Sequence, residues 1–225
     1  MQNTNIPHRQ RLVIRISRNS LSFATISNEV NGQITFKPYI LNTGISIAAN
    51  LREAFRTQEL LQDTYFRVLI MIDTPSLMVP IELFHEEEQR SLYLHTFQGH
   101  EQDEIVNTVL PDLNCVAVFS VNRDLKLVLD DHFATPTFIA ATAPVWRYLH
   151  QRSYMGVREK LYAYFHDRRM EVFTFGQNRL SSVTPLRLMM VMMSCITFFT
   201  PGSRQVCKPT ATRCTSLVTS LIVNG

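Results

Sequence analysis

Several signatures of nucleotide-binding and hydrolytic enzymes are missing from this sequence. It contains no Gly-x-Ser-x-Gly nucleophile motif, no Walker loop and no dinucleotide-binding fingerprint. The helical zinc-hydrolase pattern is also absent, because His85 in "HEEE" has no second histidine four residues further on. We therefore expect residues 85–88 to form a solvated helix surface. No motif assigns the chain to one of these enzyme classes.

Cysteine is scarce and charge is balanced. Only Cys115 lies in the first three quarters of the chain, and the spacing of Cys195, Cys207 and Cys214 matches no common zinc pattern. We expect no disulfide framework, and Cys115 lies in an apolar run where a thiol normally packs and does not react. The 22 basic and 19 acidic residues are spread along the chain. No concentrated positive field for nucleic acid is therefore expected.

No apolar run is long enough to cross a bilayer. The longest candidate, in residues 188–200, contains Ser194 and Thr197 and lies between Arg187 and Pro201. A crossing needs about 20 mostly apolar residues, so membrane insertion is not expected. The opening "MQNTNIPHRQRL" has basic residues but no apolar run of the kind found in secretory signals. We expect a cytoplasmic protein.

The first 73 residues predict three antiparallel strands, a helix and a fourth strand. In residues 12–26, apolar residues alternate with polar ones around the polar tip of residues 18–20, as in a β-hairpin. The "NG" dipeptide then predicts a turn before a third strand, "QITFKPYI". A helix with Ser46 as its N-cap is expected next. The run "RVLIMID" predicts a strand buried on both faces.

Strands and helices alternate through the middle of the chain. The segment "TPSLMVPIELF" is expected to be extended, "HEEEQRSLYLHTF" helical, and residues 98–104 a surface loop. "CVAVFSV" predicts a buried strand, followed by a helix capped by Asn122, a strand and a helix with Pro144 in its first turn. Trp146 and Tyr148 on that helix could mark a partner surface, but Trp146 and Leu149 are spaced to face the core. This alternation is typical of a layered α/β domain.

The hairpin pattern then returns. "KLYAYFHDRRMEVFTFGQNRL" again predicts two alternating strands around a polar tip, with "GQN" as the following turn. A hairpin repeated after a complete α/β unit indicates a duplication.

Two copies of a β-β-β-α-β unit resemble the duplicated ribonuclease-H-like halves of the actin-like ATPase superfamily. The segment "CVAVFSVNRDLKLVLDDHFATPTFIAA" is similar to the arrangement in its pilus-assembly and cell-division members. The first hairpin, "VPIELF" and "VFTFGQNRL" more closely resemble the bacterial domain-of-unknown-function 3822 family. The resemblance covers residues 12–179 and implies an α/β, duplicated ribonuclease H-like (actin-like ATPase) fold with an incomplete second repeat. It implies a first half in residues 1–155 and the start of a second half in residues 156–180.

The resemblance stops where an unusual methionine run begins. Methionine has a single codon, so "MMVMM" in residues 189–193 nearly dictates its bases. Read from the third base of its first codon, this run encodes Asp, Gly, a polar or aromatic residue, Asp, and Val or Glu. This pattern fits the Asp-capped helix expected after a third strand. We hypothesise a frame error near Leu180, which would make residues 181–225 a poorly structured, out-of-frame tail. The alternative is that residues 188–199 are a native core segment.

In the actin-like ATPases that the chain resembles, the tips of both hairpins cradle nucleotide phosphates. That task needs glycines, for close approach of backbone N–H groups, and a carboxylate to hold hydrated Mg²⁺. The first tip, "SRNSLS", has neither, and the second, "HDRRM", has an aspartate that we expect to pair with a neighbouring arginine. The candidate anion- or nucleotide-binding residues are Arg18, Asn19, Ser20, Asp167 and Arg168.

A shared fold does not carry an activity when the site chemistry is missing. We therefore expect a non-catalytic interaction or scaffold module with an unknown protein partner and no cofactor or metal. The alternative is a weak nucleotide-binding ATPase that uses ATP with magnesium and Asp167.

Overall fold

The chain divides into two units of mutual contacts. The computed structural model describes residues 11–26, 34–153, 160–166, 169–176, 179–187 and 214–218. Unit 1 comprises Met1–Pro111 and Cys115–Ala143, and unit 2 comprises Asp112–Asn114 and Pro144–Gly225.

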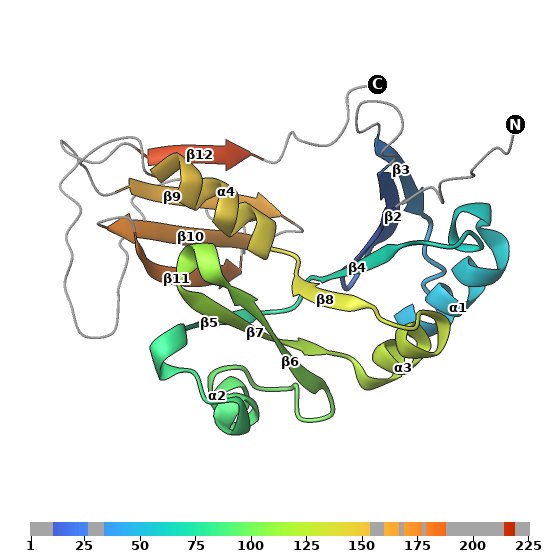
Figure 1. Cartoon of the computed structure of the whole chain (residues 1–225), viewed down its shortest axis with the longest axis horizontal. Helices are drawn as coiled ribbons and strands as arrows, with labels where there is room; N and C mark the ends of the chain where they lie inside the picture. The colour runs from blue at the N-terminus through green and yellow to red at the C-terminus, as the bar shows by residue number, and fades with distance from the viewer. Residues whose placement is uncertain are drawn as a thin grey trace, which may run out of the picture. The chain divides into compact units, whose positions relative to one another are not determined.

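Unit 1 is built on a five-stranded mixed sheet (Figure 1). Its strand order is β3-β2-β1-β4-β8. The first three strands are antiparallel, whereas β4 runs parallel to β1 and β8 runs parallel to β4. The strands are β1 (Arg11–Ile16), β2 (Leu21–Ile26), β3 (Ile34–Tyr39), β4 (Arg67–Ile72) and β8 (Thr137–Ala140). The predicted order of three antiparallel strands, a helix and a fourth strand is therefore confirmed.

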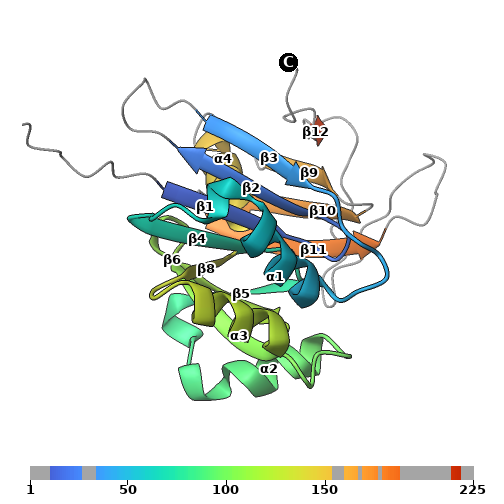
Figure 2. The same cartoon turned by 90° about the vertical axis from the view of Figure 1, so that its right-hand side faces the viewer.

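Two helices cover one face of this sheet. Helices α1 (Ile47–Thr57) and α3 (Arg123–His132) lie side by side, as both views show (Figures 1 and 2). The predicted caps are confirmed, because Ser46 Oγ accepts from Ala49 N and Asn122 Oδ1 accepts from Leu125 N. Alternate side chains of the central strands are buried on one face. They are Leu12, Ile14, Ile16, Leu21, Phe23, Val68, Ile70 and Ile72.

The other face of β4 is only half-buried, at Leu69 and Met71. The prediction that this strand is buried on both faces is therefore wrong. An unbroken apolar run cannot distinguish a strand covered on both faces from one covered on a single face.

A second, three-stranded antiparallel sheet in unit 1 has the order β5-β7-β6. Its strands are β5 (Ser76–Pro80), β6 (Glu104–Leu110) and β7 (Cys115–Val121), and α2 (Gln89–Thr96) lies against it. Every residue of β7 is buried, as expected for the central strand. The sequence pattern predicts no strand or helix for residues 105–110, which form most of β6. Short 3₁₀ turns complete the unit at Glu59–Leu61, Ile81–Leu83, Glu86–Glu88 and Pro111–Leu113.

Unit 2 repeats the strand arrangement of unit 1. Its sheet has the order β11-β10-β9-β12, with β9, β10 and β11 antiparallel and β12 parallel to β9. This matches β3-β2-β1-β4, so the predicted duplication is confirmed. The described sheet has four strands where that of unit 1 has five. The elements are α4 (Ala143–Ser153), β9 (Lys160–His166), β10 (Arg169–Gly176), β11 (Arg179–Arg187) and β12 (Cys214–Val218).

Helix α4 buries its tryptophan and exposes its tyrosine. Trp146 and Leu149 are fully buried, whereas Tyr148 is 43% exposed. The predicted core orientation of Trp146 is therefore confirmed.

The methionine run at residues 188–199 lies outside the described residues. Strand β12 and most of β11 belong to residues 181–225, but their presence does not test the reading frame, which stays a prediction. Within the described ranges, every helix is too short or too polar to cross a bilayer.

One buried amide anchors the loop before α1. The Asn50 side chain accepts from Asn42 N at 2.8 Å, and its Nδ2 donates to the carbonyl oxygens of Asn42 and Ser46, both at 3.0 Å. We expect Asn50→Asp to cost about 2–3 kcal/mol of unfolding free energy, since a carboxylate would face carbonyl oxygens it cannot bond. Asn122→Asp makes the same chemical change at a cap that only accepts, so we expect less than about 0.5 kcal/mol. Urea unfolding of both variants tests this, and equal costs would contradict it.

Candidate functional site

Buried polar residues gather where the parallel strands of unit 1 end. Ser17, Asp73 and Thr142 follow β1, β4 and β8, and each is more than nine-tenths buried. The strand pairing continues to this edge, because Asp73 N donates to Ile16 O at 2.9 Å and Ala141 N donates to Ile72 O at 2.8 Å. Ligands of open α/β sheets bind outside the carboxyl ends of the strands. This carboxyl edge is therefore the candidate functional site of unit 1.

The carboxylate of Asp73 is held by an arginine from β1. Arg15 Nη2 lies 3.4 Å from Asp73 Oδ2, and the aspartate side chain is only 3% exposed. The same guanidinium donates through Nη1 to Ser20 Oγ, also at 3.4 Å. A buried carboxylate needs such a partner, because desolvation disfavours its charged form. Arg15 thus supplies the positive charge that a bound cation would otherwise supply.

The tip of the first hairpin closes on itself. Ser17 N donates to Ser20 O at 2.9 Å, and the hydroxyl oxygens of Ser17 and Ser20 lie 2.6 Å apart. The two residues between them, Arg18 and Asn19, are exposed. Close phosphate binding by backbone N–H groups requires glycine, because a Cβ atom obstructs the approach of the phosphate. This tip contains no glycine.

The predicted anion-binding residues fall into two groups. Arg18, Asn19 and Ser20 lie together at the first tip, although the Ser20 hydroxyl is already engaged by Ser17 and Arg15. Asp167 and Arg168 lie outside the described residues, so their placement stays a prediction.

One hydroxyl at the carboxyl edge has no hydrogen-bond partner among the described residues. Thr142 Oγ1 is buried and unsatisfied. A buried polar group left unpaired costs free energy comparable to a lost hydrogen bond. A ligand with a hydrogen-bonding group at this edge would remove that cost.

These residues fit a polar ligand better than hydrated Mg²⁺. A magnesium site needs carboxylate oxygens open to the ion or its waters, whereas Asp73 is already paired with Arg15. Within the described ranges, no group of three or more His, Cys, Asp or Glu residues could hold a metal ion. We therefore derive no magnesium-dependent step from the carboxyl edge.

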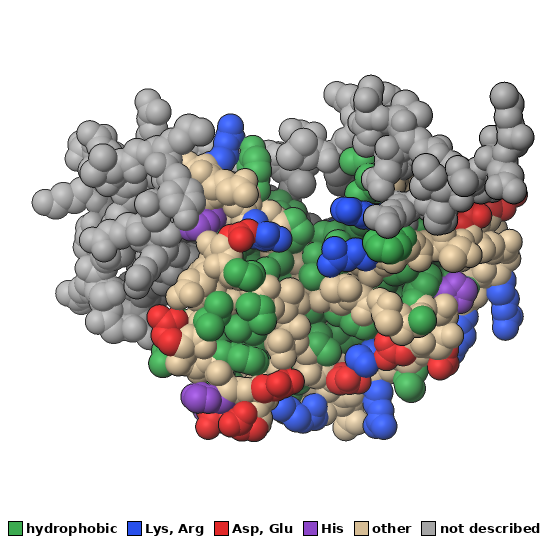
Figure 3. Space-filling model, viewed as in Figure 1, with side chains coloured by type: hydrophobic (Ala, Val, Ile, Leu, Met, Phe, Trp, Pro, Cys, Tyr) green, Lys and Arg blue, Asp and Glu red, His purple; other side chains and the backbone are tan. Residues whose placement is uncertain are grey.

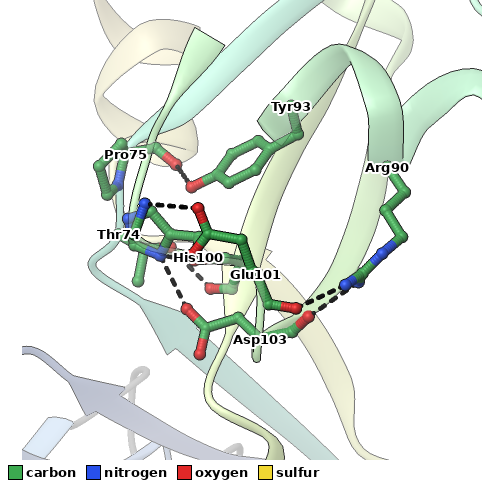
Figure 4. A network of polar contacts seen from close by, with 9 residues as sticks. Thr74, Pro75, Arg90, Tyr93, His100, Glu101 and Asp103 are labelled. Carbon is green, nitrogen blue, oxygen red and sulfur yellow. Dashed lines mark hydrogen bonds and ion pairs between the residues drawn. The ribbon is translucent and has the colours of Figure 1, made fainter. Parts of the chain in front are cut away.

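A second polar network starts at the residue after Asp73 (Figure 4). Thr74 Oγ1 donates to the carbonyl oxygen of Ser120 at 2.8 Å, and the Tyr93 hydroxyl donates to Pro75 O at 2.8 Å. Arg90 of α2 contacts the loop before β6, because its guanidinium donates to Glu101 O at 2.6 Å and to Asp103 O at 3.0 Å. Through these bonds the end of β4 is fixed to β7, α2 and the loop before β6.

The same network contains serine, histidine and aspartate side chains but not the geometry of a catalytic triad. His100 Nδ1 lies 2.7 Å from Asp103 Oδ2 and 3.0 Å from Ser120 Oγ. A triad needs the carboxylate on one ring nitrogen and the nucleophile on the other. Ser120 is also fully buried, so its hydroxyl cannot meet a substrate.

Two further candidates from the sequence have structural roles. Cys115 is buried at the start of β7, and burial raises the pKa of its thiol to about 12, which keeps it protonated and unreactive. The residues of "HEEE" are exposed, with Glu86–Glu88 forming a 3₁₀ turn before α2, and acidic side chains lie at the surface near α2 (Figure 3). Both observations confirm the expectations from the sequence.

Sequence reasoning missed Asp73, Arg15 and Thr142 as site residues. The available signal was the position of Asp73 directly after an apolar strand. It becomes informative only when β4 is known to run parallel to β1, because the carboxyl ends of parallel strands meet at one edge.

Comparison with known families gives one match that covers most of the chain. The model of a family described as "Protein of unknown function (DUF3822)" matches residues 2–182. No curated protein matches the sequence.

Solved structures include one close in fold. A Bacteroides thetaiotaomicron protein with an actin-like ATPase fold and unknown function is 26% identical, with a TM-score of 0.75 over 84% of this chain and 74% of that one. The PilM–PilN type IV pilus biogenesis complex is 13% identical, with a TM-score of 0.48 over 81% and 62%. A Cytophaga hutchinsonii exopolyphosphatase is 10% identical, with a TM-score of 0.40 over 80% and 50%. Of these three, the first is similar enough in structure to support the fold assignment, and it agrees with the predicted duplicated actin-like fold.

Burial of the Tyr93 hydroxyl predicts a specific alkaline response. Burial is the main cause that raises the pKa of Tyr93 from 10.0 to about 12. Because the folded pKa exceeds the unfolded one, this contribution to stability is complete below pH 10 and is lost as the pH rises through about 12. Tyr93→Phe should therefore cost about 1 kcal/mol at pH 7 and make stability fall less steeply above pH 10.

The exposed Tyr148 provides a matched control. Tyr148→Phe should leave the unfolding free energy at pH 7 unchanged. Both variants are compared with the original chain by urea unfolding between pH 7 and 11. An unchanged alkaline slope in Tyr93→Phe would refute the assignment.

Proposed function

This chain belongs to the DUF3822 family, and we propose that it is a non-catalytic protein with an actin-like fold that serves as an interaction or scaffold module. The observation that carries the proposal is the pairing of Asp73 with Arg15 at the carboxyl edge. The carboxylate best placed to face a metal-bound phosphate is already neutralised by the protein.

The closed hairpin tip supports the same proposal. Ser17 and Ser20 satisfy each other through backbone and side chain. Opening this tip to accept phosphates would break both contacts, and the residues present have no glycine to make the new backbone conformation accessible. Phosphate binding there would therefore have to overcome an existing set of bonds.

The free edge of the five-stranded sheet is a surface suited to an interaction module. Strand β3 pairs only with β2 among the described strands. Its Ile34 and Phe36 are 64% and 46% exposed. An edge strand presents unpaired backbone groups on which another strand can be added. Lys37 and Pro38 on the same strand limit indiscriminate pairing.

A second candidate function is weak nucleotide binding. The unsatisfied Thr142 hydroxyl favours it, because that hydroxyl lies at the edge where ligands of such sheets bind. In this alternative, ATP with magnesium would depend on Asp167 for its metal contact.

Thermal unfolding with and without Mg·ATP separates the two functions. A ligand stabilises the native state by RT ln(1 + [L]/Kd), so 5 mM ATP with a Kd of about 50 μM would add about 2.7 kcal/mol. The scaffold proposal expects no shift in Tm with Mg·ATP relative to magnesium chloride and sodium triphosphate controls. A magnesium-dependent shift that Asp167→Asn abolishes would establish the alternative.

The reading frame decides which protein that test should use. We propose that the frame changes near Leu180, because a shifted frame turns residues 189–193 into the start of an Asp-capped helix. A second repeat that cannot complete its sheet would leave strand edges and apolar helix faces exposed. We therefore expect the chain as given to aggregate, and a frame-restored version to remain monodisperse in size-exclusion chromatography.

Sequencing the gene around codon 180 tests the frame directly. The expected result is an insertion or deletion whose repair encodes a helix beginning with Asp-Gly after the third strand of the second repeat. An alternative frame closed by stop codons would refute the proposal. So would a soluble, cooperatively unfolding monomer made from the chain as given.

A further inference from the structure

A shallow, open cleft lies between α1 and α3, the two helices that cover the five-stranded sheet. It has a volume of about 330 Å³, at the lower end of the range for small-molecule sites. Helices α1 and α3 lie next to each other in both views (Figures 1 and 2). The cleft is lined by Arg52, Phe55, Arg56, Val128, Asp131 and His132. None of these residues belongs to the carboxyl edge.

Two arginines give one wall of the cleft its charge. Arg52 and Arg56 are four residues apart on α1, so both project from the same side of the helix. Neither has a carboxylate within ion-pair distance among the described residues. Arg56 also lies in the last turn of α1, where a cation complements the helix dipole. That role needs one arginine only, whereas two guanidinium groups on the same side of a helix can both donate to the oxygens of a phosphate.

A stacked ring pair fixes the histidine of the cleft. The rings of Phe55 and His132 are stacked, with centroids 3.7 Å apart and planes at 7°. His132 Nε2 lies 3.4 Å from the carbonyl oxygen of Leu61. Because a carbonyl can only accept, Nε2 carries the proton in this contact, which leaves Nδ1 of the neutral ring as an acceptor.

The opposite wall is suited to hydroxyl groups. Asp131 extends the cleft from the end of α3, and its carboxylate accepts hydrogen bonds but repels a second anion. Val128 and Phe55 contribute apolar surface between the charged walls. A complementary ligand therefore carries a phosphate at one end and hydroxyl groups at the other.

We propose that this cleft binds a phosphate monoester of a small hydroxylated compound, such as a sugar phosphate. Arg52 and Arg56 bind the phosphate, Asp131 and His132 Nδ1 accept hydrogen bonds from hydroxyl groups, and the Phe55–His132 stack holds the wall in place. Binding needs no magnesium and does not depend on the function proposed for the carboxyl edge.

Isothermal titration calorimetry with a panel of three phosphate monoesters tests the proposal. The probes are glycerol 3-phosphate, glucose 6-phosphate and adenosine 5′-monophosphate, with glucose, inorganic phosphate and sulfate as comparators. We expect at least one monoester to bind with a Kd of about 1 mM or lower, at least about tenfold tighter than every comparator. Both helices precede residue 180, so the full chain in whichever reading frame is soluble can be used.

Three variants assign the binding to this cleft. The double variant Arg52→Ala, Arg56→Ala should weaken monoester binding at least about tenfold, and Asp131→Asn should reduce the preference for the monoester over inorganic phosphate. Arg123→Ala removes an arginine at the start of α3 that lies outside the cleft, and should leave binding unchanged. Circular dichroism melts check that the variants remain folded.

Several results would overturn the proposal. One is no heat of binding from any monoester up to about 10 mM. Others are sulfate binding as tightly as the best monoester, or full binding retained by the double variant. If binding is lost in Asp73→Asn but not in the double variant, the ligand occupies the carboxyl edge, which contradicts the present proposal and the scaffold proposal together.

Discussion

Parallel pairing of β1 with β4 is the constraint on which the rest of unit 1 depends. Strand β3 runs in the same direction as β1, so the chain must cross back over the sheet through α1 to place β4 parallel to β1. The crossover places α1 against the sheet beside α3, and it brings the ends of β1 and β4 to one edge. Arg15 and Asp73 meet because of that pairing, and the buried carboxylate is tolerated because they meet. Unit 2 repeats the relation between β9 and β12.

Local sequence signals predict most of the helices and strands. The features they do not predict depend on contacts between segments far apart in the chain. Alternation, turn dipeptides and caps located both hairpins, α1 with Ser46, and α3 with Asn122, because each signal acts over a few residues. The sequence does not predict β6, because Asn107 and Thr108 at its centre are polar. In the fold, Asn107 Nδ2 donates to Gln89 Oε1, and Thr108 Oγ1 donates to the carbonyl oxygen of Phe138. The sequence does not predict the carboxyl edge either. Asp73 can be identified as a site residue only when β4 is known to pair with β1, which brings Arg15 beside it.

The two proposals assign different tasks to different parts of unit 1. At the carboxyl edge, the protein's own groups pair with one another, which lowers the capacity of that edge for a charged ligand. Between α1 and α3, two guanidinium groups have no such partner among the described residues. Charge that is satisfied internally stabilises the fold, whereas charge that is left unsatisfied is available for recognition. Under the two proposals, recognition takes place on the helical layer and along β3, the edge strand of the described sheet.

The three-stranded sheet has a consequence for the order in which unit 1 folds. A short connection joins β6 to β7, in which Leu110 pairs with Cys115. Pro80 of β5 also pairs with Cys115, but more than thirty residues separate the two in the chain. Closing the short loop costs far less chain entropy than closing the long one. The β6–β7 hairpin should therefore form early, and β5 should add to it once α2 has folded. A nascent chain released before Val121 would thus carry an unpaired β5, ready to associate with another chain.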